Sequence, residues 1–153
     1  MAGTLYQSMR MKPLYIFSIA LASFLLFNSC SKDIFKSYEE RIEGTWELDD
    51  INRTGIGGDR DDLPFRDGSF VFTNNGGLTY TTGSGAVFKG SWDMQRGPAA
   101  DNGTPTSLQI TAVNFTTQEI RSEYFEQIQF TGTDKFKAWV RQGWQTYVYH
   151  FKR

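Results

Sequence analysis

The sequence is poor in the residues on which most catalytic and disulfide-stabilised proteins depend. Its single cysteine, Cys30, excludes an internal disulfide, so the core and the backbone hydrogen bonds must hold the fold. Its single histidine, His150, lies near the end of the sequence, and no second cysteine is present to act as a nucleophile. The usual combinations of nucleophile and base are therefore missing, and we predict no enzymatic activity.

Positive charge is not in excess either. The chain carries 16 lysines and arginines against 17 aspartates and glutamates. Binding to nucleic acid needs clustered positive charge to neutralise phosphates, and the sequence offers no such cluster. We therefore predict no nucleic-acid partner.

Only one long apolar run is present, Leu14 to Phe27, and it follows the basic residue Lys12. A helix of this run would be about 20 Å long, against roughly 30 Å of bilayer hydrocarbon, so it is too short to span a membrane comfortably. A basic start followed by a short apolar stretch is typical of a cleaved export signal. We predict that residues 1–29 form a signal peptide, for which Met11 gives a more ordinary start than Met1.

The end of this run resembles a bacterial lipoprotein signal. Ser29 and Cys30 match the small residue and the cysteine between which such signals are cleaved. The resemblance implies that Cys30 is acylated and anchors the protein to the outer membrane of the cell envelope, because Ser31 rather than aspartate follows it. Whether the domain then faces the periplasm or the cell surface is left open. The alternative is an ordinary secretory signal with an incidental cysteine.

The remaining residues, 30–153, suffice for one domain with one core. Their formal charge is about −3, because the signal removes two basic residues and no acidic one. Within residues 30–43, a short amphipathic helix is predicted over Asp33 to Ile42, with Asp33 as its N-cap. Such a helix either flanks the core or lies on the membrane surface beside the lipid anchor.

From Gly44 onward the apolar residues follow a period of two, which predicts strands separated by tight turns rich in Gly, Asn and Asp. Consecutive antiparallel hairpins either close into an up-and-down barrel or fold as a two-sheet sandwich. The predicted strands are Thr45 to Asn52, Ser69 to Thr73, Leu78 to Thr82, Ala86 to Met94, Ser107 to Asn114, Ile120 to Thr131, Lys135 to Arg141 and Gln145 to Lys152.

A short repeat favours the barrel. The order Gly44-Thr45-Trp46-Glu47-Leu48 recurs as Gly90-Ser91-Trp92-Asp93-Met94. The Gly-x-Trp start of the first strand, after a short helix, resembles the lipocalin-like members of the calycin superfamily. The chain from Cys30 onward is similar to small lipocalin-like lipoproteins common in Bacteroidetes. The resemblance implies an all-β, eight-stranded antiparallel up-and-down lipocalin-like barrel over 44–153, with a short N-terminal helix.

In that family a basic side chain from the last part of the barrel stacks on the first tryptophan. Arg153 or Arg141 would fill this role over Trp46. Gly44, Trp46, Gly90 and Trp92 are accordingly interpreted as fold markers. Because side chains alternate along a strand, taking Trp46 as inward predicts the following core: Leu48, Asp50, Phe70, Phe72, Leu78, Tyr80, Phe88, Trp92, Leu108, Ile110, Tyr124, Ile128, Phe130, Phe136 and Val140. The facing of the last strand is left open, since both of its faces carry rings.

The polar loops offer no specific chemistry. The adjacent acids Asp49 and Asp50 point to opposite faces of a strand, and they cannot act as a pair across one bond. The longest loop, Asn52 to Asp67, contains Asp59-Arg60-Asp61-Asp62 but lacks the glycine and glutamate of a calcium loop, so a mobile, solvated lid is expected there. We predict no metal and no cofactor.

The leading functional prediction is a non-enzymatic lipoprotein that binds a small apolar or amphipathic ligand inside the barrel. The ligand would enter at the end opposite Trp46, under the loop Asn52 to Asp67, and its contacts are assigned to Trp92, Tyr80, Tyr124 and Asp50. The alternative is a surface interaction module with a filled interior, which contacts a protein or glycan through Trp139, Trp144, Tyr147 and Tyr149. An enclosed apolar cavity would favour the first function and a filled core the second.

Overall fold

The structure is a computed structural model that describes residues 36–55, 62–96 and 106–153. All of them belong to one compact unit, Lys36–Arg153. The predicted signal peptide, Cys30 and Asp33 lie outside the described residues. Within the described part of the chain, no helix is long and apolar enough to cross a bilayer.

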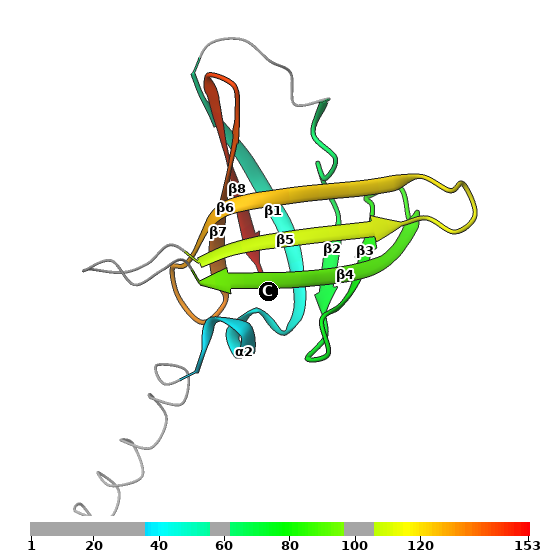
Figure 1. Ribbon diagram of the computed structural model, residues 1–153, viewed down its shortest axis with the longest axis horizontal. Coiled ribbons are helices and arrows are strands. Elements are labelled where there is room, and N and C mark those ends of the chain that lie inside the picture. The colour runs from blue at the N-terminus through cyan, green and yellow to red at the C-terminus, as the bar shows by residue number, and fades with distance from the viewer. Residues whose placement is uncertain (1–35, 56–61, 97–105) are drawn as a thin grey trace, which may run out of the picture. The chain divides into compact units, whose positions relative to one another are not determined.

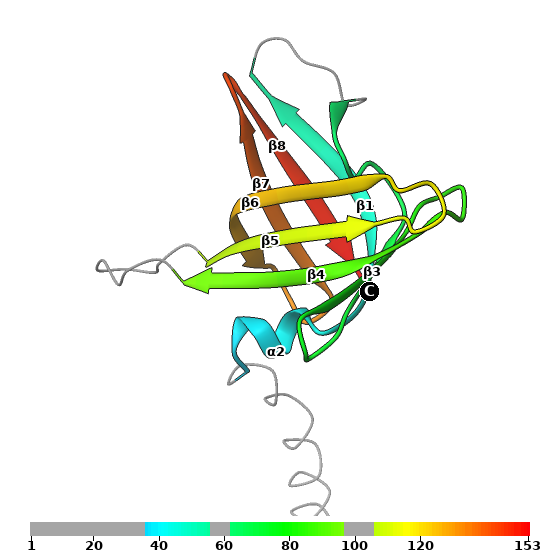
Figure 2. The same ribbon diagram turned by 45° about the vertical axis from the view of Figure 1, so that its right-hand side comes forward.

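Eight antiparallel strands close into a barrel, in which each strand pairs with the next and β8 pairs back with β1 (Figure 1, Figure 2). The predicted up-and-down barrel is confirmed, and the alternative sandwich is wrong. The strands are β1 Gly44–Thr54, β2 Ser69–Phe72, β3 Gly77–Thr81, β4 Val87–Arg96, β5 Thr106–Val113, β6 Ile120–Phe130, β7 Lys135–Gln142 and β8 Gln145–Lys152.

The helix before the barrel, α2 Tyr38–Ile42, is shorter than predicted. Ser37 is its N-cap and has an extended backbone, so no helix runs continuously from Asp33 to Ile42. The Ser37 hydroxyl accepts a hydrogen bond from the Glu40 amide at 3.2 Å, and the Glu40 carboxylate accepts one from the Ser37 amide at 2.9 Å. This reciprocal capping box satisfies two amides that a helix start leaves without partners, and it therefore fixes the start at Ser37.

One end of the barrel is closed by Trp46 and α2. Trp46 is fully buried, and its indole Nε1 donates a hydrogen bond to the Ile42 carbonyl at 2.6 Å. Its ring packs edge-on against Phe136, with 4.7 Å between the ring centroids. The Arg153 guanidinium lies 4.3 Å from the indole centroid, so Arg153 rather than Arg141 takes the predicted stacking position. We call this end the closed end.

Two of the glycines that mark the fold are required by local geometry. Gly44 begins β1 with a φ of +113°, a backbone conformation that side chains with a Cβ rarely adopt. Gly90 faces β5 so closely that an added Cβ would lie 1.9 Å from the Thr111 carbonyl oxygen. The predicted interpretation of both residues as fold markers therefore has a steric basis.

Two β-bulges overturn part of the predicted core. The register of β1 against β8 shifts between Leu48 and Asp50, so Ile51 becomes the next inward residue and Asp50 is exposed. The β5–β6 register shifts as well, which turns Phe125 inward and leaves Tyr124 49% exposed. Since one extra residue reverses the alternation, strict period-two counting failed at both places.

The rest of the predicted core is largely confirmed. Trp92 and Phe130 are only partly buried but pack against the core cluster. On β8 the inward face carries Tyr147, Tyr149 and Phe151, which settles the facing that the sequence left open. The buried hydrophobic residues that sequence counting missed include Ile51, Leu63, Phe65, Ala112, Phe125 and Ala138.

The segment that leads into β2 is not the solvated lid that was expected. Residues 56–61 of the loop lie outside the described residues, but Leu63 is 3% exposed and Phe65 is fully buried. Phe65 packs edge-on against Tyr80, with 4.9 Å between their ring centroids, and also contacts Phe70. Residues 62–68 therefore form a plug in the end of the barrel opposite Trp46.

Candidate ligand site at the plugged end of the barrel

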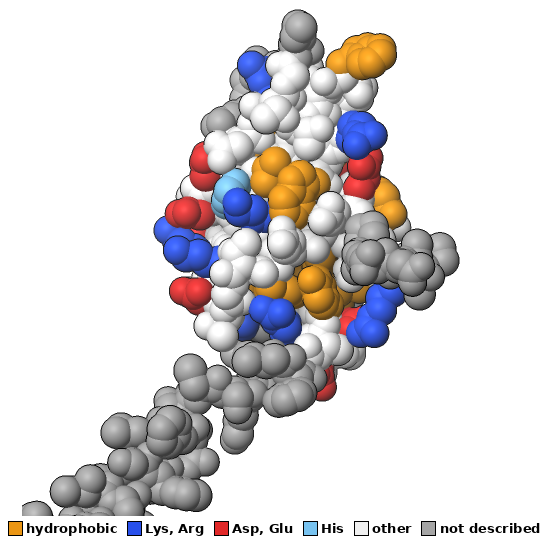
Figure 3. Space-filling view, turned by 90° about the vertical axis from the view of Figure 1, so that its left-hand side faces the viewer, with side chains coloured by type: hydrophobic (Ala, Val, Ile, Leu, Met, Phe, Trp, Pro, Cys, Tyr) orange, Lys and Arg blue, Asp and Glu red, His pale blue; other side chains and the backbone are white. Residues whose placement is uncertain are grey.

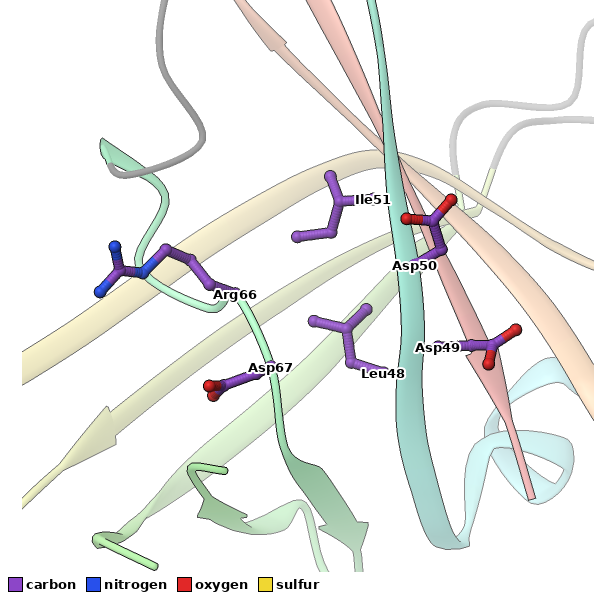
Figure 4. Close-up of a pocket in the computed structure, with 6 residues that line it drawn as sticks. All are labelled: Leu48, Asp49, Asp50, Ile51, Arg66 and Asp67. Atoms are coloured by element: carbon purple, nitrogen blue, oxygen red, sulfur yellow. The ribbon is translucent and has the colours of Figure 1, made fainter. Parts of the chain in front are cut away.

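The barrel wall has an opening between β1 and the plug. β1 pairs with β2 only from Gly44 to Glu47, and one more hydrogen bond joins the Leu48 amide to the Gly68 carbonyl at 2.9 Å. Beyond the bulge β1 continues along β8, while the plug diverges from it. A pocket of about 230 Å³ lies in this opening (Figure 4).

The pocket has an apolar side and a charged rim. Leu48 and Ile51 are both buried. Their side chains project from β1 toward the plug, where Arg66 and Asp67 lie (Figure 4). Asp49 and Asp50 project to the other side of β1. The opening therefore presents one carboxylate, of Asp67, and one guanidinium, of Arg66, beside two aliphatic side chains, an arrangement suited to a small amphipathic molecule.

The plug is fastened to the barrel on both sides. Arg121 Nη1 donates hydrogen bonds to the Pro64 carbonyl at 3.1 Å and to the Tyr80 hydroxyl at 3.4 Å. Asp67 Oδ1 accepts hydrogen bonds from the Gly83 amide at 3.1 Å and from the Tyr80 hydroxyl at 3.4 Å. Burial, together with the neighbouring Asp67 carboxylate, raises the pKa of Tyr80 to about 12, so the hydroxyl stays protonated as a donor.

Behind the plug, the interior contains polar atoms that lack partners. Among the described residues, two buried side-chain oxygens make no hydrogen bond: Glu123 Oε2 and Tyr149 Oη. Glu123 and Phe125 are on the inward face of β6, and Tyr149 is the cross-strand partner of the pocket residue Ile51. Burial raises the pKa of Glu123 and that of Tyr149, and the Glu123 carboxylate raises the pKa of Tyr149 further.

The charges on the outer side of β1 are already paired in part. Asp49 accepts a hydrogen bond from Lys152 Nζ at 2.7 Å, and this contact holds the pKa of Asp49 below its usual value. His150 lies opposite Asp50 on β8 and forms a hydrogen bond with the Asn52 side chain at 3.1 Å between Nε2 and Nδ2. Across the described ranges, no group of three or more histidine, cysteine or acidic side chains is placed to hold a metal ion.

The structure does not bring the four predicted contact residues together. Tyr80 is inside the barrel at the plugged end, and Asp50 lies at the outer rim of the pocket. Tyr124 is on the outer surface of β6, because the register of β6 against β5 shifts. Trp92 lies beside the β2–β3 turn on the side of the closed end, where its Nε1 donates to the Thr73 carbonyl at 3.0 Å.

Sequence reasoning missed Arg121, Glu123 and Tyr149, which are now the polar groups at the plugged end. The available signal was the alternation Arg121, Glu123, Phe125, because these residues share one face of a strand. Alternation from Ile128 and Phe130 leads to Tyr124 instead, because the bulge in β6 lies between them. A charged residue on an inward face is rare, so the pattern gave little reason to prefer the correct alternation.

Comparison with known proteins supplies no relative: no family model, curated protein or solved structure matches the chain.

Proposed function

We propose that the protein is a non-enzymatic lipoprotein, anchored at the outer membrane through acylated Cys30, whose lipocalin-like barrel binds a small amphipathic ligand. The observation that carries this proposal is the pocket between β1 and the plug, with Leu48 and Ile51 on its inner side. The stacking of Arg153 on Trp46 is consistent with the family resemblance from which the proposal began.

The ligand must be short. Large rings fill the interior toward the closed end, among them Phe70, Phe136 and Phe151, whose ring centroids lie 4.4–5.4 Å apart where they touch. The pocket, at about 230 Å³, is smaller than the roughly 300–1,000 Å³ of sites that enclose drug-sized ligands. A long fatty acid or a sterol therefore does not fit, and a molecule with a short apolar chain does.

Filling the pocket tests this function. Ile51→Trp places a large ring in the opening, so binding of the short alcohol hexanol should weaken by about tenfold or more in calorimetric titration. Val148→Trp is the matched control, because Val148 is on the outer face of β8 and leaves the pocket unchanged. Equal affinity in the two variants would refute this placement of the site.

The anchor requires its own test. Cys30→Ser removes the only thiol that can be acylated, so the protein should move from the membrane fraction to the soluble fraction. Membrane retention of this variant would refute the lipid anchor. Protease treatment of intact cells then distinguishes a surface-facing domain, which is cleaved, from a periplasmic one, which is protected.

The second candidate function is a surface interaction module, and exposed apolar side chains favour it. Trp144 is 95% exposed in the β7–β8 turn, and Phe115 is 76% exposed in the β5–β6 turn. On the outer faces of β7 and β8, Trp139 and Val148 are cross-strand partners, and apolar side chains gather on the face that carries the histidine (Figure 3). Tyr147 and Tyr149 cannot serve here, since both are buried.

Site-directed cross-linking in cells discriminates between these functions. A cross-linker placed at Trp144 or Phe115 should capture a protein partner if the outer surface functions in recognition. The same cross-linker at Glu126, an exposed position on β6, is the control. Hexanol binding that is sensitive to Ile51→Trp, without capture at either turn, would leave ligand binding as the function.

A further inference from the structure

The two buried oxygens without partners, Glu123 Oε2 and Tyr149 Oη, are the least explained feature of the barrel. Tyr149 is fully buried, and its ring packs edge-on against Phe125, with 5.1 Å between the ring centroids. A buried polar atom without a partner costs about 1–3 kcal/mol, and a buried carboxylate costs more. Packing alone therefore does not account for two such atoms on the inward face of the barrel.

The neighbouring cation does not neutralise Glu123. Arg121 is two residues earlier on the same face of β6, yet its Nε donates to Glu119 at 2.7 Å. Its Nη1 is bonded to Pro64 and Tyr80, and its guanidinium lies 4.5 Å from the centroid of Phe88. The Glu123 carboxylate accepts one hydrogen bond, from the Tyr124 amide to Oε1 at 3.0 Å, and Oε2 is left over.

The chemistry of these atoms selects the complementary group. An ionised carboxylate only accepts hydrogen bonds, so its partner must be a donor, and in a buried position a positively charged donor compensates best. A phenol oxygen can accept a second bond from the same donor group. A primary ammonium has three donors, and aromatic walls such as the rings of Phe125 and Tyr149 attract cations.

We propose that the barrel interior recognises a small organic ammonium ion, which enters between β1 and the plug and donates hydrogen bonds to Glu123 Oε2 and Tyr149 Oη. This rests on the proposed ligand-binding function and names its ligand class. The pocket and Tyr149 are neighbours in the sheet, because Ile51 lines the pocket and is the cross-strand partner of Tyr149. The apolar chain of the ligand then lies against Leu48 and Ile51.

Three probes of equal chain length test the charge preference: hexylammonium, hexanol and hexanoate, titrated calorimetrically into the purified full-length protein in detergent against a detergent blank. Hexylammonium should bind about tenfold tighter than hexanol or more, and hexanoate should bind more weakly than either. Glu123→Gln should abolish the preference for hexylammonium over hexanol. Tyr149→Phe should weaken hexylammonium binding several-fold, since it removes only the hydroxyl.

Matched controls come from the outer face of the same strand. Glu126→Gln changes an exposed carboxylate that lies 3.9 Å from Arg141, and Tyr124→Phe removes an exposed hydroxyl. Both variants should bind hexylammonium as the unmodified protein does. A measurement that needs no variant uses hexyltrimethylammonium, which has the charge but no N–H donor and should bind about tenfold more weakly than hexylammonium.

The outcomes separate the two proposals. Equal binding of hexylammonium and hexanol, or a preference that persists in Glu123→Gln, overturns the ammonium site and leaves the pocket standing. Equal binding of hexyltrimethylammonium and hexylammonium overturns the donor role of the ammonium. Failure of hexylammonium, hexanol and hexanoate all to bind overturns the ligand-binding function itself, and the ammonium site with it.

Discussion

Replacing Trp46 by alanine should be among the most destabilising single changes in this barrel. The substitution deletes a fully buried indole and its edge-on contact with Phe136, and it leaves the Ile42 carbonyl without its donor. Deleting a buried large ring costs about 3–5 kcal/mol, and a domain of this size is stable by only about 5–15 kcal/mol. We expect a loss of about 3–5 kcal/mol, toward the upper end because Arg153 loses its ring partner as well.

Urea unfolding monitored by circular dichroism measures this loss of stability, and two further variants serve as controls. Trp144→Ala makes the same chemical change at a side chain that is 95% exposed, and it should alter stability by less than about 0.5 kcal/mol. Trp46→Phe keeps a ring but removes the hydrogen bond to Ile42, so it should cost about 1–3 kcal/mol even if the alanine variant does not fold. A loss below about 1 kcal/mol for Trp46→Ala would refute the assignment of Trp46 as the buried side chain that closes the closed end.

Three more predictions concern Arg153, Gly90 and Glu123. Arg153→Ala should cost about 1–3 kcal/mol in urea unfolding, because it removes the ring contact and hydrogen bonds to three backbone carbonyls, whereas Arg141→Ala should be nearly neutral. Gly90→Ala should lower stability by about 1–3 kcal/mol or more, since its Cβ would collide with the Thr111 carbonyl; unchanged melting would contradict that close approach. Glu123→Gln should raise the melting temperature at pH 7 but not near pH 4. Burial raises the pKa of the Glu123 carboxyl in the folded protein, so the folded protein loses stability as the pH rises and this carboxyl ionises. An equal gain in melting temperature at both pH values would exclude ionisation as the cause.

The strands could be predicted closely because hairpin turns and alternation are local signals. Gln145 to Lys152 was predicted with its observed bounds, and the other strands differ by one or two residues at their ends. The closed end could also be anticipated, since Gly44 and Trp46 define it within three residues. Alternation settled the facing of side chains wherever a strand kept its register.

The site could not be predicted in the same way, because it depends on irregularities. The bulge after Leu48 exchanges Asp50 for Ile51, and the shifted register of β6 exchanges Tyr124 for Phe125. A bulge is specified by the pairing of two strands that are far apart in sequence, so neither strand alone signals it. The plug is a second example: the aspartates near Asp62 suggested a solvated loop, while two residues beyond them, Leu63 and Phe65, are buried.

The same irregularities create the pocket on which the proposed binding function rests, in a barrel whose interior is otherwise filled with rings. The bulge turns β1 away from β2, and this leaves an opening that a regular barrel of short strands would not have. The plug covers the interior with Phe65 but is joined to the wall by polar contacts from Arg121 and Asp67. The plug also buries Leu63 and Phe65, so apolar packing as well as polar contacts hold it in place. The proposed ligand would therefore enter at the opening between β1 and the plug, while Trp46 and α2 close the other end of the barrel.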